Sequence, residues 1–255
     1  MSPAHFSRNL SALAVLALLC AVVRPDAAPR VQTSTRMTGL PARTLWVWER
    51  PEDMRAVDPT TTALAALDQM LLVGPAIEQL PRRQTVVYPA GATRIAVVRI
   101  ETRKGARLDL EQARATAALS LESAREPGVA ALQIDFDARR SERAFYAAVL
   151  AELHRRMPAE MPLSMTALAS WCSSDDWIGG LPVDEAVPMF FRMEPDRDPR
   201  SRRPEFRIRE PLCQTSVGVS THEPWPEGIA GKRVYVFADR GWRADYALLA
   251  ERKLR

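Results

Sequence analysis

From Leu45 onward, the chain alternates short, almost continuous apolar runs with stretches in which apolar residues recur at helical spacing. Such runs are typical of strands that are buried on both faces of a parallel sheet. The predicted helices are Leu108–Ala124, Ser141–Met157 and Trp242–Leu254. The eight predicted strands are Leu45–Glu49, Met70–Val73, Arg94–Glu101, Val129–Asp137, Leu163–Trp171, Ala186–Met193, Ser216–Thr221 and Val234–Ala238.

Eight strands in series predict an α/β fold, a compact (β/α)8 TIM-type barrel. An open doubly wound α/β sheet is the alternative, although no glycine-rich phosphate loop follows the first strand. The 211 residues from Leu45 to Arg255 leave about 26 for each unit, against about 31 in a typical barrel. We therefore expect some helices to be reduced to loops, above all where eight prolines fall between Pro182 and Pro226.

The N-terminus is a separate unit, in which Arg8 precedes the apolar run Leu10–Val23. This run suits a signal peptide and is too short to span a membrane comfortably. We expect a signal peptide over residues 1–28, a polar linker over 29–43 and a single barrel domain over 44–255. The protein is then exported, to the periplasm. An uncleaved N-terminal anchor, which leaves the barrel membrane-anchored and facing the periplasm, is the alternative.

Two cysteines, Cys172 and Cys213, remain after the leader. In an exported protein they can form a disulfide that closes a loop of about 40 residues. Two buried free thiols are the alternative that the sequence leaves open. With only His154 and His222 beside them, the cysteines do not form a zinc cluster of the usual spacing, so we expect no metal and no cofactor.

The charge balance is weakly basic, with 35 lysines and arginines against 31 acidic residues. Only three of these basic residues are lysines. A nucleic-acid-binding protein concentrates both basic types on one face, so we expect no nucleic-acid partner. The basic run Arg197–Arg209 is interpreted as a solvated loop.

The richest candidate chemistry lies in the strand Val129–Asp137. Its alternation turns Asp135 and Asp137 toward the barrel interior, at the carboxyl end where barrel enzymes hold their active sites. Two crowded carboxylates differ in pKa, which suits general acid/base chemistry. Asp137 is the predicted catalytic acid, and Asp135 has a supporting or substrate-binding role. Arg99, on the preceding strand, lies on the same face as Glu101. Its side chain should therefore also point into the barrel, where it can neutralise Asp135.

Two further acids end or follow strands. Glu49 closes the first strand, and Glu223 follows the seventh; either is a candidate for the second catalytic carboxylate. Arg192 lies in an apolar run, and a buried guanidinium needs a partner, so it is a candidate clamp for a protein carboxylate or an anionic substrate group.

Three tryptophans fall at or just after predicted strand ends: Trp48, Trp171 and Trp242. An indole face can stack on the apolar face of a sugar ring, which makes these residues candidate substrate platforms. We expect the ligand to be a carbohydrate or another small molecule. The competing interpretation is that each one belongs to the hydrophobic core.

The chain contains, in order, the segments ALQIDFDA, SERAFYAAVLAELHRRMP, LSMTALASWC, VPMFFRME, PLCQTSVGVSTHEPWP and RVYVFADRGW. In their order they resemble the bacterial domain-of-unknown-function 3142 family, over a span from about Leu45 to Trp242. The resemblance implies an exported bacterial protein with a distant glycoside-hydrolase-like barrel. It carries over no catalytic residues.

A more remote likeness is to the chitinase-like barrels, whose fourth strand ends in alternating acids. Here the alternating set continues from Asp135 and Asp137 to Arg139, so an arginine replaces the terminal acid of that pattern. This departure argues against the substrate-assisted chemistry of chitinases, so the acid is Asp137 itself or comes from another strand. From the carboxylates at strand ends and the tryptophans near them, we expect an exported protein that acts on envelope or extracellular glycans as a glycoside hydrolase. A non-catalytic barrel that binds a glycan or serves as an envelope scaffold is the alternative.

Overall fold

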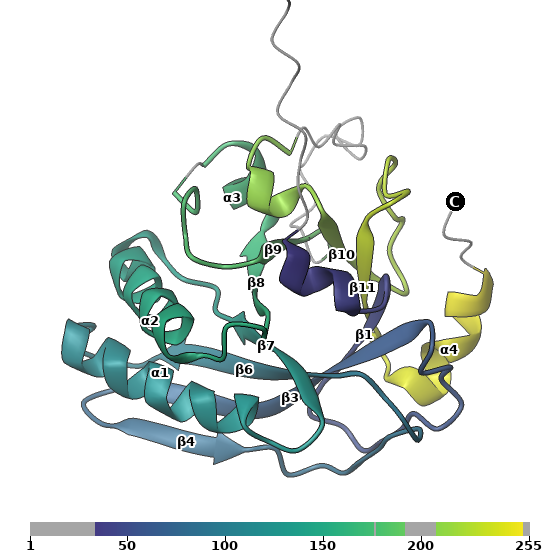
Figure 1. Ribbon diagram of the computed structural model, residues 1–255, viewed down its shortest axis with the longest axis horizontal. Coiled ribbons are helices and arrows are strands. Elements are labelled where there is room, and N and C mark those ends of the chain that lie inside the picture. The colour runs from purple at the N-terminus through teal and green to yellow at the C-terminus, as the bar shows by residue number, and fades with distance from the viewer. Residues whose placement is uncertain (1–33, 176, 192–207, 252–255) are drawn as a thin grey trace, which may run out of the picture. The chain divides into compact units, whose positions relative to one another are not determined.

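The computed structural model describes residues 34–175, 177–191 and 208–251. Within these ranges, eight parallel strands close into a barrel, because the first strand pairs with both the second and the last (Figure 1). This confirms the predicted (β/α)8-type barrel, and the closure excludes the open sheet. In spatial order the strands are β1 (Arg43–Val47), β3 (Thr62–Val73), β6 (Arg94–Thr102), β7 (Val129–Asp135), β8 (Leu163–Leu168), β9 (Glu185–Met189), β10 (Ser216–Ser220) and β11 (Arg233–Phe237).

The other elements surround this barrel. The helices are α1 (Leu110–Ala124), α2 (Arg143–Arg156), α3 (Ala169–Ser173) and α4 (Trp242–Glu251), with 3-10 turns η1 (Thr35–Gly39), η2 (Arg140–Glu142) and η4 (Pro211–Cys213). Strand β4 (Ile77–Pro81) pairs antiparallel with β3, and β2 (Glu52–Asp53) pairs with β5 (Val86–Val87). No helix in the described ranges has the length and apolarity needed to cross a membrane.

The barrel has fewer helices than an ideal one, as its short length predicts. Helices α1, α2 and α4 follow β6, β7 and β11, while β8 is followed only by the five-residue α3. The short strands β2, β4 and β5 follow β1 and β3, in a part of the chain where none of the three predicted helices falls. Strand β3 is also longer than predicted, because it begins at Thr62. Its register against β6 shifts between Leu67 and Gln69, which changes the face of each following side chain and hides the alternation.

The core is divided between the two faces of the barrel wall. Outward-facing residues of β7 such as Ile134 pack in one cluster with residues of α1 and α2, including Leu121 and Leu150. Inward-facing residues such as Val97 and Tyr235 form a separate interior cluster. The predicted orientation of β7 is therefore correct, with Asp135 directed inward.

The described part of the predicted linker packs against the barrel. Met37 in η1 is fully buried. The Arg233 guanidinium, at the start of β11, donates to the carbonyl oxygens of Met37 at 2.7 Å and Leu40 at 2.8 Å. Residues from about 35 onward therefore belong to the folded domain and cover the amino-terminal end of the strands.

Candidate functional site

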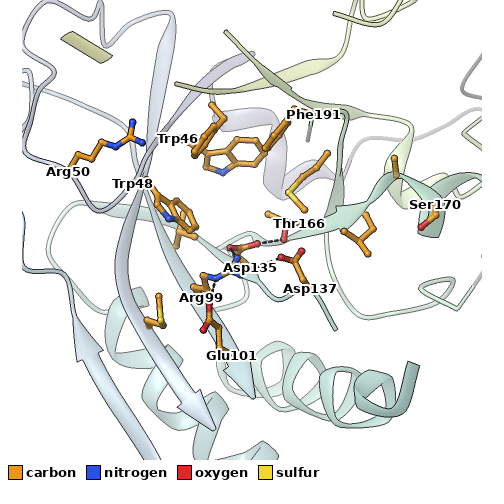
Figure 2. A pocket seen from close by; sticks show the side chains of 16 residues that line it. Trp46, Trp48, Arg50, Arg99, Glu101, Asp135, Asp137, Thr166, Ser170 and Phe191 are labelled. Atoms are coloured by element: carbon orange, nitrogen blue, oxygen red, sulfur yellow. Dashed lines mark hydrogen bonds and ion pairs between the residues drawn. The ribbon is translucent and has the colours of Figure 1, made fainter. Parts of the chain in front are cut away.

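A cavity of about 830 Å³ lies at the carboxyl ends of the barrel strands (Figure 2). This is the end of the barrel at which enzymes of this architecture place their active sites. Its charged lining residues are Arg50, Arg99, Glu101, Asp135 and Asp137. Its aromatic and methionine lining residues are Trp46, Trp48, Met70, Met189, Phe191 and Phe237.

The Arg99 guanidinium connects the three acids of this cavity. Its Nη1 atom lies 2.7 Å from Oδ2 of Asp135, its Nε atom 2.9 Å from Oε1 of Glu101, and its Nη2 atom 3.4 Å from Oδ2 of Asp137. The predicted pairing of Arg99 with Asp135 is present. The cluster also recruits Glu101, which β6 turns to the same face as Arg99.

The three carboxylates differ in their access to the cavity. Asp135 is buried, with 4% of its surface exposed, and its second oxygen accepts a 2.7 Å hydrogen bond from the Thr166 hydroxyl. By contrast, 45% of the side-chain surface is exposed in both Asp137 and Glu101. Asp135 therefore serves to hold Arg99, while Asp137 and Glu101 can reach a bound molecule.

The pKa of the Asp137 carboxyl group is raised above its ordinary value. Burial raises the pKa of its carboxyl group, and the neighbouring Asp135 carboxylate raises the pKa further, while Arg99 opposes both effects. Burial lowers the pKa of the Arg99 guanidinium, but Asp135, Glu101 and Asp137 together raise that pKa above its usual value. Arg99 thus stays charged, and Asp137 keeps its proton to a higher pH than an ordinary aspartate.

An aromatic wall faces these acids. Phe191 and Phe237 are stacked, with centroids 5.5 Å apart and planes at 4°. Trp48 meets Phe237 edge to face at 6.4 Å, and Trp46 meets Phe191 in the same way at 6.0 Å. Flat aromatic surfaces therefore line the cavity next to its carboxylates.

Trp46 is held at the floor of the cavity by the barrel interior. Its indole nitrogen donates a 2.7 Å hydrogen bond to Gln133 Oε1, and the amide nitrogen of Gln133 donates at 3.0 Å to the Ser164 hydroxyl. Ser164 in turn contacts the buried carboxylate of Glu185, whose pKa is raised by burial. The position of Trp46 is therefore fixed by polar contacts as well as by packing.

Glu49 and Glu223 do not belong to the lining of this cavity. Glu49 follows the outward parity of Leu45 and Val47, and its Oε1 atom accepts the backbone N–H groups of Arg83 at 3.1 Å and Gln84 at 3.0 Å. Glu49 therefore anchors a loop. Glu223 lies in the loop between β10 and β11. The second carboxylate beside Asp137 is Glu101 instead.

Trp48 alone among the three predicted tryptophan platforms reaches the cavity. Trp171 is 3% exposed and packs on Trp177, with centroids 4.9 Å apart. The reason is that β8 ends at Leu168 and the turn of α3 rotates Trp171 into the outer core. Trp242 is 2% exposed, and its indole nitrogen donates at 2.8 Å to the Trp46 carbonyl oxygen, so it supports the wall from outside.

Cys172 and Cys213 form a disulfide that joins α3 to η4. Helix α3 also contributes Ala169 and Ser170 to the cavity, so the bond fixes part of its lining. The candidate clamp Arg192 lies outside the described residues. Within the described ranges, no group of histidine, cysteine and acidic side chains has the arrangement of a metal site.

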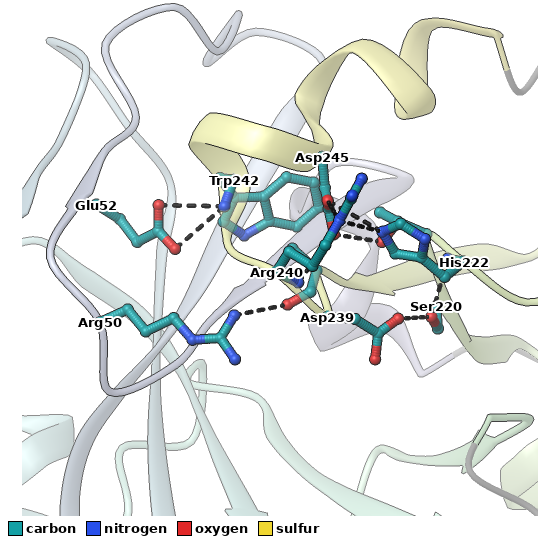
Figure 3. A network of polar contacts seen from close by, with 10 residues as sticks. Arg50, Glu52, Ser220, His222, Asp239, Arg240, Trp242 and Asp245 are labelled. Carbon is teal, nitrogen blue, oxygen red and sulfur yellow. Dashed lines mark hydrogen bonds and ion pairs between the residues drawn. The ribbon is translucent and has the colours of Figure 1, made fainter.

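A second polar cluster lies beside the cavity and connects the ends of β10 and β11 with α4 (Figure 3). Asp245 is its centre, because its carboxylate accepts from the Thr221 hydroxyl at 2.7 Å and lies 3.1 Å from His222 Nε2. Burial acts to raise the pKa of Asp245, but hydrogen bonds from His222, Thr221 and Arg240 lower it to about 2. The cluster attaches α4 to the barrel and adds no residue to the cavity lining.

Fold and site together define a (β/α)8-type barrel protein with an acidic, aromatic-lined cavity at the carboxyl ends of its strands. The family model described as "Domain of unknown function (DUF3142)" matches residues 90–198. This match confirms the resemblance over a shorter span than Leu45–Trp242, and its span includes Arg99, Glu101 and Asp137. No curated protein and no solved structure is significantly similar to the chain.

Sequence reasoning did not identify Glu101, Trp46 or Arg50 as site residues. The alternation of side chains along a strand could have identified Glu101 and Trp46. Glu101 lies two residues beyond Arg99 on the inward face, and Trp46 lies two residues before Trp48. Arg50 follows the strand in a loop, where no periodicity predicts the direction of a side chain.

Proposed function

We propose that the protein is an exported glycoside hydrolase, with Asp137 as general acid and Glu101 as the second carboxylate. The observation that carries this proposal is the half-exposed Asp137 carboxyl group, with its raised pKa, facing an aromatic-lined cavity beside a second exposed carboxylate. Most glycoside hydrolases use such a pair of carboxyl groups, one of them protonated.

Asp137 would donate its proton to the glycosidic oxygen as the bond to the anomeric carbon breaks. A carboxyl group whose pKa is raised toward the working pH retains that proton in the resting enzyme. Asp135 takes part indirectly, because its charge raises the pKa of Asp137 and its hydrogen bond orients Arg99. It is a positioning residue in this mechanism.

Glu101 would supply the second carboxylate, which assists attack at the anomeric carbon. It accepts a 2.9 Å hydrogen bond from Arg99 Nε, so it is held beside Asp137 by the same guanidinium. Water provides the atoms that complete the reaction: a hydroxyl group goes to the anomeric carbon and a proton restores Asp137. The mechanism requires no cofactor.

The site of action would be outside the cytoplasm. The Cys172–Cys213 disulfide supports this location, because such bonds persist in oxidising compartments and are rare in the cytosol. The apolar run Leu10–Val23 would direct export.

A non-catalytic, glycan-binding barrel is the second candidate. The observation that favours it is the contact of Arg99 with all three acids of the cavity, which leaves each acid with a cationic partner. This candidate differs from the first in one measurable respect, because it binds a glycan without turning it over.

The test is a turnover screen of the chain against envelope and extracellular oligosaccharides, with product analysis. We expect Asp137→Asn and Glu101→Gln each to reduce kcat/KM by about 10²–10⁴-fold. Glu126→Gln is the matched control, because Glu126 is exposed at the opposite end of the barrel. Binding without turnover would support the second candidate, and turnover that survives Asp137→Asn would reject the assigned acid.

A further inference from the structure

The cavity contains a second guanidinium, that of Arg50, which the proposed chemistry does not use. Arg99 is paired with three carboxylates, whereas Arg50 has no ion pair with any residue in the described part of the chain. Its one side-chain hydrogen bond within that part is a 3.4 Å contact from Nη1 to the Ala238 carbonyl oxygen. A half-buried arginine with unused donors in a binding cavity is suited to a planar anion.

The backbone around Arg50 is fixed before any ligand arrives. The N–H group of Arg50 donates at 2.7 Å to the Trp48 carbonyl oxygen, which closes a tight turn. The Arg82 guanidinium donates at 2.6 Å to the Arg50 carbonyl oxygen and at 3.0 Å to that of Val47. Because Arg82 holds the turn from outside, Trp48 and Arg50 are presented together to the cavity.

The Arg50 side chain lies beside the backbone that leads into α4 (Figure 3). A Cβ atom placed on Gly241 would lie 3.6 Å from Arg50 Cδ and 3.7 Å from Nη1, which is ordinary van der Waals contact, whereas Glu52 Oε1 would lie at only 2.9 Å. The backbone at Gly241 therefore bounds Arg50 on one side and limits the directions that its side chain can take.

The positions of the charged groups give the cavity two distinct ends. Figure 2 shows Trp48 between Arg50 on one side and Asp135 and Asp137 on the other. Strand β3 separates β1 from β6, and β6 separates β3 from β7, so along the barrel wall Glu101 on β6 is about two strand spacings from β1, roughly 10 Å, and the end of β7 about three, roughly 14 Å. A sugar ring stacked on Trp48 would then have one edge directed toward Arg50 and the other toward Glu101 and Asp137.

We infer that the sugar bound on Trp48 carries a carboxylate, and that the ligand is an acidic glycan containing a uronic acid. Arg50 donates two parallel N–H groups to that carboxylate, while the neutral edge of the ring faces Asp137 and Glu101. The acidic end of the cavity disfavours the reverse orientation, because it would bring the ligand carboxylate to three protein carboxylates. The inference that an acidic glycan is cleaved rests on the proposed function. The inference that an acidic glycan is bound does not depend on that function.

The test measures binding in the Asp137→Asn background, which slows the turnover of glycosides whose leaving group needs a proton. The probes are therefore α- and β-linked methyl glucuronides and galacturonides, each with its glucoside or galactoside counterpart. By titration calorimetry we expect at least one uronide to bind about 10- to 100-fold more tightly than its neutral counterpart. Arg50→Gln should abolish this difference, and Arg50→Lys should retain part of it.

Arg125→Gln is the matched control, because Arg125 is exposed at the C-terminus of α1, at the other end of the barrel. Unchanged circular dichroism verifies that each variant is folded. Equal affinity for uronides and neutral glycosides, no binding of any uronide, or a preference that survives Arg50→Gln would overturn the inference. Uronide binding that depends on Arg50, without turnover in the wild type, would keep the inference and reject the hydrolase. Turnover of neutral glycosides by the wild type, with no preference for uronides, would support the hydrolase and reject the inference that the ligand is acidic.

Discussion

Arg99 and Asp135 form an ion pair across neighbouring strands, with Nη1 of the guanidinium 2.7 Å from Oδ2 of the carboxylate; the carboxylate is buried, whereas 23% of the Arg99 side-chain surface is exposed. Removal of the cation in Arg99→Met would leave the buried Asp135 with only the Thr166 hydroxyl as a partner. We expect a loss of about 1–3 kcal/mol in the free energy of unfolding, measured by urea denaturation, less than for a fully buried pair.

Arg55→Met is the control for that variant, because Arg55 is paired with Asp53 at the surface. The urea midpoint of Arg55→Met should stay at the wild-type value. The double variant Arg99→Met/Asp135→Leu should recover part of the loss, since it removes the buried charge as well. A wild-type midpoint for Arg99→Met alone would show that the pair has no structural role.

Gly218 allows the close approach of Trp46 to β10. A Cβ atom at this position would lie 2.8 Å from Trp46 Cη2 and 3.3 Å from the Pro188 carbonyl oxygen. We therefore expect Gly218→Ala to displace the indole and to cost about 1–3 kcal/mol of stability, observed by thermal unfolding together with tryptophan fluorescence. Gly39→Ala, where no atom lies within 4 Å, should leave both signals unchanged.

Asp245 should give the protein an acid-sensitive attachment of α4. Its pKa is held at about 2, below the unfolded value, so its stabilising effect is present above the unfolded pKa and is lost as the pH falls through about 2. The stability difference between wild type and Asp245→Asn should therefore be largest at neutral pH and shrink below about pH 4. A difference that is constant from pH 7 to pH 2 would contradict the assignment.

The Cys172–Cys213 disulfide closes a sequence separation of 41 residues. Chain-entropy reasoning gives it about 3–4 kcal/mol of stabilisation, so Cys172→Ala/Cys213→Ala should lower the urea midpoint by a corresponding amount. Reductant should lower the wild-type midpoint to that of the double variant and leave the variant unaffected. An unchanged wild-type midpoint in reductant would mean that the bond contributes nothing.

Strand alternation was sufficient to predict the barrel and part of its site. The continuous apolar run of β7 indicated a buried strand, and its parity turned Asp135 inward toward Arg99. The same reasoning was incomplete for β3, because the irregularity between Leu67 and Gln69 changes the side-chain face within one strand. The alternation of residues along a strand predicts the direction of a side chain only where the pairing with the neighbouring strand is regular.

The residues that sequence reasoning misplaced lie at strand ends and beyond. Trp171 turns outward because β8 ends at Leu168, three residues before the predicted end of the strand, and a helix begins at Ala169. Glu49 has outward parity, and its carboxylate is used by the backbone of Arg83 and Gln84. Loop direction depends on tertiary contacts such as these, which a single sequence does not encode locally.

The role of Asp137 as general acid is tested most directly by its dependence on the leaving group. The measurement compares kcat/KM of wild type and Asp137→Asn on two glycosides of one sugar, one with an alkyl and one with a 2,4-dinitrophenyl leaving group. We expect a loss of about 10²–10⁴-fold on the alkyl glycoside and little loss on the dinitrophenyl glycoside, whose leaving group needs no proton. Wild-type activity on the alkyl glycoside should also fall as the pH rises through the pKa of Asp137, because the raised pKa keeps the acid protonated only below it. An equal loss on both substrates, or no loss on either, would contradict the assignment.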